Sequence, residues 1–284
     1  MWPDSAGRGR LWRGHAVLPA GRQGRSRMPA AVFEEGCAEA GVPLLFWREV
    51  PVDPHDLGET ARACMPTILQ AFLGRPDDTP AGDAFERRLY VCRRTIEKKA
   101  DAEFALRDKI FYVCSMSSRT IVYKGMFLVH DLRLFYTDLQ DEDYESAIGM
   151  VHSRFSTNTN PSWMRAHPNR FILHNGEINT IKGNTDAMLA REESISSSIM
   201  QDDMNKILPI INTSGSDSAM LDNTLEFMVM NGMDLPLAVM ITIPEPWENN
   251  KNISQEKAGF LPVLRHHAGA VGPAPPPSCS RTAM

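Results

Sequence analysis

Residues whose side chains could take part in binding or catalysis are concentrated between His152 and Asn184, where the sequence reads HSRFSTNTNPSWMRAHPNRFILHNGEINTIKGN. Within this stretch, the side-chain amide of Asn175 and the N–H of Gly176 are two donors that could stabilise a developing oxyanion. Glycine also lets the backbone come close to a ligand. The same dipeptide is the commonest hairpin signal, so taken alone it favours a turn over a catalytic role.

Two charged residues have the chemistry to bind an amino acid. Arg154 is flanked by hydroxyl residues, among them Thr157, and such a guanidinium can grip a carboxylate with two parallel hydrogen bonds. Asp217, in GSDSA, could hold an ammonium group. Each also has a simpler interpretation: Arg154 as a surface ion-pair partner, and Asp217 as a helix cap.

Three histidines near these residues, His152, His167 and His174, raise the question of a metal site. They lack the i, i+4 spacing of a helical metal motif and have no clear set of carboxylate partners. We therefore expect no metal, and interpret His174 as a histidine at the end of a strand.

Composition excludes several classes of protein. The 284 residues are 43% hydrophobic with a formal charge of −5, which predicts a globular protein and gives no indication of nucleic-acid or membrane binding. The five cysteines show no CxxC spacing, which argues against disulfides or zinc. The longest apolar run, residues 235–244, is too short for the ~20 residues that span a bilayer. We expect a cytoplasmic protein.

The middle of the chain shows alternating helical and strand patterns. We expect a helix from Val32 that stops at Gly41, and strands at 44–47 and 66–74. A helix is expected at 85–100. Its apolar face would bury Phe85, Leu89, Cys92 and Ile96, and its other face would expose Arg93 and the other basic residues. Further expectations are a hairpin at 109–128, a short helix at 138–149, a strand at 149–155, and helices at 187–199 and 215–232, the last stopped by Gly232.

The two ends differ from the middle. Residues 1–31 hold six arginines, no lysine and one acidic residue, and residues 258–284 are rich in proline and small residues. Neither segment shows a globular pattern, so we divide the chain into a non-globular segment 1–31, a domain at 32–257 and a non-globular tail at 258–284. An Arg-rich leader is also typical of an organelle transit peptide.

The stretch from His152 to Asn184, with GSDSAMLDN and IPEPWENN downstream, resembles the class II glutamine amidotransferase domain of the glutamate synthase large subunit. HNGEIN is common to class II amidotransferases, whereas the Pro-Trp after the arginine loop and the later GSDSA are particular to glutamate synthase. The resemblance extends from Val32 to about Lys257 and includes SSRTIVYKGM.

The resemblance implies an α+β fold of the N-terminal-nucleophile hydrolase type, a four-layer αββα sandwich of two antiparallel sheets between helices. It implies that Arg154, assisted by Thr157, binds the α-carboxylate of L-glutamine. Asp217 would bind the α-ammonium, and Asn175 and Gly176 would form the oxyanion hole. FMN and an iron–sulfur cluster would belong to downstream synthase domains, and this chain would carry no cofactor.

The family's nucleophile is a cysteine at the mature N-terminus, whose own α-amine, with a pKa near ~8, can act as the base. Here the first residue is Met1, and none of the five cysteines follows the family's opening motif. We therefore expect a domain that is incomplete at both ends, lacks the nucleophile and has little or no glutaminase turnover.

Codon degeneracy offers one explanation for the two ends. Suitable codons for residues 259–266, read one nucleotide later, give DFYRYYAT, and suitable codons for residues 11–28 give YGVGM, both typical of the family. We therefore hypothesise frame shifts at both ends, which sequencing of the coding DNA would test. The transit-peptide interpretation ranks second because it does not explain the tail.

Two other functions remain open. The chain could be a non-catalytic glutamine-binding module or a remnant fragment. It could also belong to a different class II amidotransferase, such as a sugar-phosphate aminating enzyme, although the long insertion between Thr157 and Asn175 argues against that alternative.

Overall fold

The computed structural model describes residues 11–17, 27–104, 111–153, 160–174, 178, 181–243, 253–256 and 259, with residues 11–17, 27, 28 and 104 described by their backbone alone. The chain divides into two compact units. The first unit comprises residues 1–155 and 160–167, and the second comprises residues 156–159 and 168–284.

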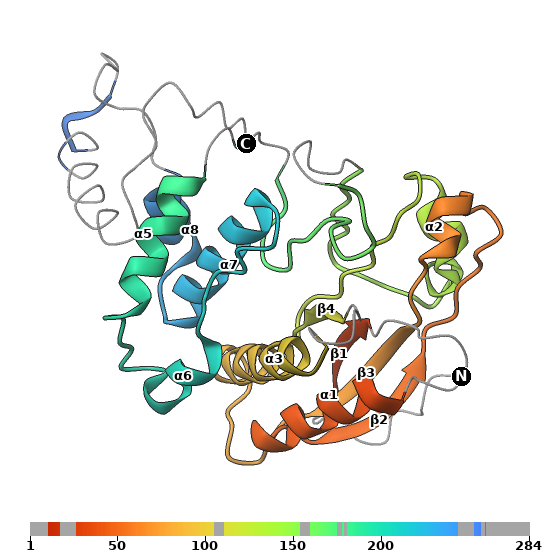
Figure 1. The fold of residues 1–284 in the computed structure, drawn as a ribbon, viewed down its shortest axis with the longest axis horizontal. Helices are drawn as coiled ribbons and strands as arrows, with labels where there is room; N and C mark the ends of the chain where they lie inside the picture. The colour runs from red at the N-terminus through yellow and green to blue at the C-terminus, as the bar shows by residue number, and fades with distance from the viewer. Residues whose placement is uncertain are drawn as a thin grey trace. The chain divides into compact units, whose positions relative to one another are not determined.

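The first unit is built on a four-stranded antiparallel sheet in the order β2-β3-β1-β4 (Figure 1). Its strands are β1 (Leu11–Val17), β2 (Leu44–Glu49), β3 (Ile68–Gly74) and β4 (Tyr112–Met116). In the register of the sheet, Gly14 of β1 lies opposite Ala71 of β3 on one side and Met116 of β4 on the other. Strand β1 thus lies inside the segment 1–31, for which the sequence predicts no element.

Two helices, α1 (Arg27–Glu39) and α3 (Asp83–Phe104), pack together against one face of this sheet. The expected apolar face of α3 is confirmed, because Phe85, Leu89, Cys92 and Ile96 are at most 1% exposed. Helix α1 begins before the expected Val32, but its end is confirmed: Gly41 has a φ of +64°, a conformation that glycine adopts without a steric penalty.

A second hydrophobic cluster covers the other face of the sheet. It contains Tyr112 and Cys114 of β4, which alternate with Val113 on the opposite face, together with Tyr136 and Trp163. The indole Nε1 of Trp163 donates to the carbonyl of Ala61, 3.0 Å away. Three short helices lie in this part of the chain, α2 (Glu59–Ala63), α4 (Asp131–Phe135) and η2 (Thr137–Gln140).

The expected hairpin at 109–128 is wrong in its second half, because β4 is followed by turns and irregular backbone. Side chains replace the strand-to-strand bonds there. The Glu86 carboxylate accepts bonds from Ser117 and Ser118, and the Ser115 hydroxyl accepts the N–H of Val122 at 3.2 Å. The short-range bond from Val122 to Ser115 competes with sheet pairing, and the bonds to Glu86 hold the turn from another part of the chain. Residues 149–153, expected to be a strand, are also irregular.

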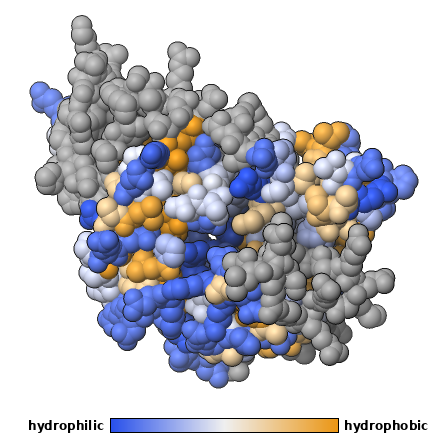
Figure 2. All heavy atoms as spheres, in the orientation of Figure 1, coloured by the Kyte–Doolittle hydropathy of each residue, from blue (hydrophilic) through white to orange (hydrophobic). Residues whose placement is uncertain are grey.

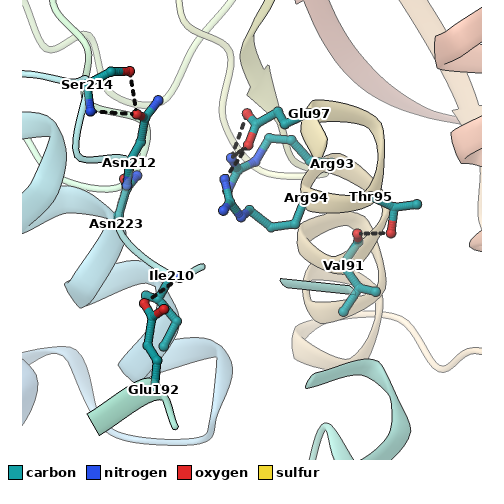
Figure 3. Close-up of polar contacts among 10 residues, drawn as sticks. All are labelled: Val91, Arg93, Arg94, Thr95, Glu97, Glu192, Ile210, Asn212, Ser214 and Asn223. Carbon is teal, nitrogen blue, oxygen red and sulfur yellow. Dashed lines mark hydrogen bonds and ion pairs between the residues drawn. The ribbon is translucent and has the colours of Figure 1, made fainter. Parts of the chain in front are cut away.

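The expected exposure of Arg93 is wrong as well, since this residue is only 1% exposed. Its Nη1 contacts both carboxylate oxygens of Glu97, at 2.9 and 3.0 Å, and Arg94 binds the same carboxylate (Figure 3). Pairing of this kind offsets part of the cost of burying a guanidinium. Hydrophilic residues cover the region of α3 on the face drawn in Figure 2.

The described part of the second unit is helical and contains no strand. Its elements are α5 (Lys182–Glu192), η3 (Gln201–Asp203), α6 (Met204–Ile207), α7 (Asp217–Met230) and α8 (Leu235–Thr242). The expected end of α7 is confirmed, because Gly232 has a φ of +88°.

Helices and a small antiparallel sheet agree with an α+β class, and the described residues form one sheet. None of the helices in the described ranges is long and apolar enough to cross a membrane.

Candidate functional site

The structure describes only part of the set of residues expected to bind glutamine. Arg154 and Thr157 lie outside the described residues, as do Asn175 and Gly176, so their expected roles stay predictions. Asp217 is described, and so are the residues that directly precede Arg154 and Asn175.

Asp217 is the first residue of α7, and its neighbour Ser216 provides the cap. The Ser216 hydroxyl accepts the N–H of Ala219 at 3.2 Å, which is the usual N-cap bond. Asp217 accepts the N–H of Ser218 at 2.6 Å and remains partly exposed. The capping role considered for Asp217 therefore belongs to Ser216, and the Asp217 side chain is partly exposed at the start of the helix.

The loop before α7 is held by side chains rather than by a sheet. Asn212 accepts both the N–H of Ser214, at 3.0 Å, and its hydroxyl, at 2.7 Å (Figure 3). The N–H of Asn212 donates to Oδ1 of Asn223, which lies in the second turn of α7, at 3.2 Å. The loop is further fixed by Glu192, whose carboxylate accepts the N–H of Ile210 at 2.7 Å. The backbone that carries Asp217 is therefore well anchored.

The segment that precedes Asn175 is held by one carboxylate, that of Asp222. Its Oδ2 accepts the N–H of Arg170, and its Oδ1 accepts the N–H groups of Phe171 and Ile172, each at 2.9 Å. Asp222 is 0% exposed. Burial and the neighbouring charge of Glu226 raise the pKa of Asp222 to about 6, while the three N–H bonds act in the opposite direction.

Sequence reasoning did not single out Asp222. Its signal is weak: an acidic residue within the apolar stretch AMLDNTLEFM, where an unpartnered charge would be costly. The bonded N–H groups lie some fifty residues earlier in the chain. No local pattern connects the two.

Two of the three histidines lie close together in the first unit. The rings of His152 and His167 are 5.3 Å apart between centroids, and His167 has a φ of 44°. His174 lies in irregular backbone rather than at the end of a strand. Across the described ranges, no group of three or more His, Cys, Asp or Glu side chains is arranged to hold a metal ion.

Four of the five cysteines are described, and all are reduced. Cys37 and Cys92 are buried between α1 and α3 with their sulfurs 3.8 Å apart, and Cys114 is buried in β4. Hydrogen bonding with Cys92, together with burial, raises the pKa of Cys37 far above that of a free thiol, which disfavours the nucleophilic thiolate. Cys64 is exposed, and its Sγ donates to the Thr60 carbonyl at 3.1 Å.

Comparison with known families identifies the class of protein. The pattern that defines the class II glutamine amidotransferases matches residues 7–274 of this chain. The chain therefore belongs to the class II glutamine amidotransferases, as the HNGEIN stretch suggested.

The similar individual proteins are glutamate synthases. The chain is 46% identical over 235 residues to the glutamate synthase [NADPH] large chain of Bacillus subtilis, an alignment that covers 83% of this chain and 15% of that protein. It is 44% identical to the glutamate synthase [NADH] of Schizosaccharomyces pombe, covering 82% and 11% respectively. It is also 44% identical to ferredoxin-dependent glutamate synthase 1 of Arabidopsis thaliana, covering 84% and 14%. The chain spans at most 15% of the length of these relatives.

Proposed function

We propose that this chain is the glutamine amidotransferase domain of a glutamate synthase and that its ligand is L-glutamine. The observation that carries the proposal is the similarity to glutamate synthases over more than four fifths of the chain. The proposal also includes a cytoplasmic location, with an organelle as the alternative.

In the proposed site, the guanidinium of Arg154 and the hydroxyl of Thr157 bind the α-carboxylate of glutamine. Asp217 binds the α-ammonium. The anchored loop and the Ser216 cap support this role, because they leave the Asp217 carboxylate partly exposed at a fixed place. Asn175 and Gly176 donate to the oxygen of the γ-amide as negative charge develops on it.

For the intact family domain we propose the four-layer αββα sandwich. There, an N-terminal cysteine would attack the γ-amide, release ammonia and form a γ-glutamyl thioester that water hydrolyses to glutamate. Downstream synthase domains would add the ammonia to 2-oxoglutarate. FMN and an iron–sulfur cluster in those domains would relay the electrons from an external donor.

We expect this chain to turn glutamine over slowly or not at all. None of the five cysteines follows the family's opening motif, so none is assigned as the nucleophile. Three of the four described thiols are buried. An oxyanion hole without its nucleophile retains only residual catalysis. A non-catalytic glutamine-binding module is therefore the alternative function.

Calorimetry with glutamine and with glutaramate, which is glutamine without the α-ammonium, tests the proposed site. Because charge-assisted bonds contribute about 1.5–3 kcal/mol, D217N should weaken glutamine binding roughly ten- to a hundredfold. D217N should leave glutaramate binding unchanged, since that ligand has no ammonium to lose. D234N is the matched control, because Asp234 precedes α8 without making a side-chain cap bond.

A glutaminase assay with an electrophilic glutamine analogue tests the catalytic part of the proposal. We expect neither turnover nor covalent labelling. Labelling of Cys37 or Cys64 accompanied by turnover would show that the chain has its own nucleophile. Absence of glutamine binding in calorimetry would instead identify the chain as a remnant.

A further inference from the structure

Two cysteine side chains meet in the core of the first unit. Cys37 lies on α1 and Cys92 lies on α3, and their Sγ atoms are 3.8 Å apart. The two residues are 55 positions apart in the chain, and their side chains are at most 1% exposed. The thiols are therefore brought together by the packing of the two helices, and both are shielded from water.

The helices that carry these thiols approach each other closely at this level (Figure 1). Gly36 precedes Cys37, and a Cβ added to Gly36 would lie only 3.2 Å from the Cα of Ile96, one turn beyond Cys92 on α3. The Sγ of Cys92 also lies 3.9 Å from the carbonyl oxygen of Gly36. Because a disulfide requires Cα atoms within about 7 Å of each other, two helices that pack this closely favour such a bond.

The pair is separate from the other described thiols. Cys114 belongs to the hydrophobic cluster on the opposite face of the sheet. Cys64 is exposed at the end of α2, where its Sγ donates to the carbonyl of Thr60. Within the described ranges, no third His, Cys, Asp or Glu side chain completes a metal site with the pair. Two thiols without further ligands suit oxidation to a disulfide better than they suit zinc.

We propose that Cys37 and Cys92 form a redox pair, in which a peroxide oxidises the two thiols to a disulfide that joins α1 to α3 within the folded first unit. The S–S bond is about 2.05 Å long, so closure must bring the sulfurs nearer by roughly 1.8 Å through rotation of the two side chains. The alternative is that both cysteines only fill space, as small apolar side chains do. The proposed reaction does not depend on glutamine binding.

The reaction balances with hydrogen peroxide as the oxidant. The thiolate of one cysteine attacks a peroxide oxygen, which breaks the O–O bond, forms a sulfenic acid and releases hydroxide. The second thiol then attacks the sulfenic sulfur, so that the S–S bond forms and water leaves with the proton of that thiol. The hydroxide takes up the proton of the first thiol. Two thiols and one peroxide therefore give one disulfide and two waters.

The surroundings of the pair make this oxidation slow. Hydrogen bonding with Cys92, together with burial, raises the pKa of Cys37 far above that of a free thiol, and the thiolate is the reactive form. The pair should therefore stay reduced without an oxidant and close over minutes to hours of exposure to peroxide. Disulfides of cytosolic proteins are usually transient or redox-sensing, which agrees with the proposed cytoplasmic location.

The test is treatment of the full chain with hydrogen peroxide under native conditions. The remaining thiols are then blocked after unfolding, and linked peptides are identified by mass spectrometry. We expect one linked pair, joined through Cys37 and Cys92 and released by dithiothreitol. C64S removes the exposed thiol and C114S removes the other buried thiol, and both matched controls should give the same linked pair. C37S and C92S should not give it.

Urea unfolding of the oxidised and the reduced protein measures the consequence for the fold. The disulfide closes a long loop in the unfolded chain, so the midpoint should rise by about 1–2 M urea. Peroxide should cause no such rise in C92S. If the serine variants do not fold, the linked peptides and midpoints of native protein decide alone.

Several results would overturn the proposal. One is the absence of the Cys37–Cys92 peptide from native protein after oxidation, and another is sulfinic acid at either residue without a link. Links to the other cysteines that form as readily would show that the fold does not select this pair. A midpoint that stays the same or falls after the link forms would show that the bond does not fit the folded unit.

Discussion

Glu86 and Asp83 both lie in the first turn of α3 and both hold the turn that follows β4, but only Glu86 is buried. Glu86 is 8% exposed. Its carboxylate accepts the N–H of Ser118 and the hydroxyl of Ser117, both at 2.7 Å, and it also accepts the hydroxyl of Ser118. Asp83 pairs with Arg119, and their side chains are 82% and 55% exposed. The two contacts should therefore differ strongly in their effect on stability.

The expected magnitudes follow from burial. A hydrogen bond to a charged group contributes about 1.5–3 kcal/mol, but the half-buried serine hydroxyls can turn to water when the carboxylate is removed. We therefore expect E86A to lower the free energy of unfolding by about 2–4 kcal/mol, mainly through the unpaired Ser118 N–H. E86Q, which keeps one acceptor oxygen, should cost about half as much. R119Q breaks only the exposed ion pair and should cost less than about 1 kcal/mol.

Urea unfolding followed by tryptophan fluorescence measures these differences, because four of the five tryptophans belong to the first unit and only Trp247 belongs to the second. The order of cost should be E86A, E86Q, R119Q. If R119Q destabilised the unit as much as E86A, burial would not be what separates the two contacts. An E86A variant as stable as native protein would refute the inference that this carboxylate replaces the missing strand pairing.

Two further predictions concern pH and backbone conformation. The pKa of Asp222 is raised from 3.8 to about 6 on folding, so the folded state binds more protons than the unfolded state between these pH values. The stability that results is present below pH 4 and is lost as the pH rises through 6. Between pH 4 and 7, the free energy of unfolding of native protein should therefore fall by up to about 3 kcal/mol relative to D222N, as measured by native-state hydrogen exchange in α7. G41A should destabilise the first unit by about 1 kcal/mol, because Gly41 has a φ of +64°. G149A, where an added Cβ meets nothing within 4 Å and the φ is not positive, should cause no destabilisation in the same urea assay.

Sequence patterns predicted those elements whose signals are local. The periodic face of α3, the glycines that end α1 and α7, and the apolar runs of β2 and β3 each place the needed information within a few residues. These elements, most of which belong to the first unit, could therefore be predicted from the sequence.

The sequence patterns also led to errors: the helix expected at 138–149 is reduced to η2, and the helix expected at 187–199 ends at Glu192. Other misses depend on contacts that periodicity does not encode. Arg93 is on the charged side of the α3 pattern, and its burial with Glu97 cannot be read from periodicity. Residues after β4 have strand-like composition, but hydrogen bonds to the side chains of Glu86 and Ser115 replace the backbone bonds that a second strand would make with β4. The bonds of Asp222 join segments that no spacing rule connects, and Leu11–Val17 lies among arginines and glycines that mask a strand.

The place of β1 in the sheet has a consequence for the order in which this protein can be made. Within the described residues β1 is the first strand to leave the ribosome, yet its neighbours β3 and β4 are synthesised much later, and β4 joins the sheet only through β1. The sheet therefore cannot close until the chain has reached Met116. Pairings so far apart in sequence form slowly, and during that wait an unpaired early strand is open to association with other chains. We therefore expect chains that end before Met116 to associate with one another more readily than chains that include β4.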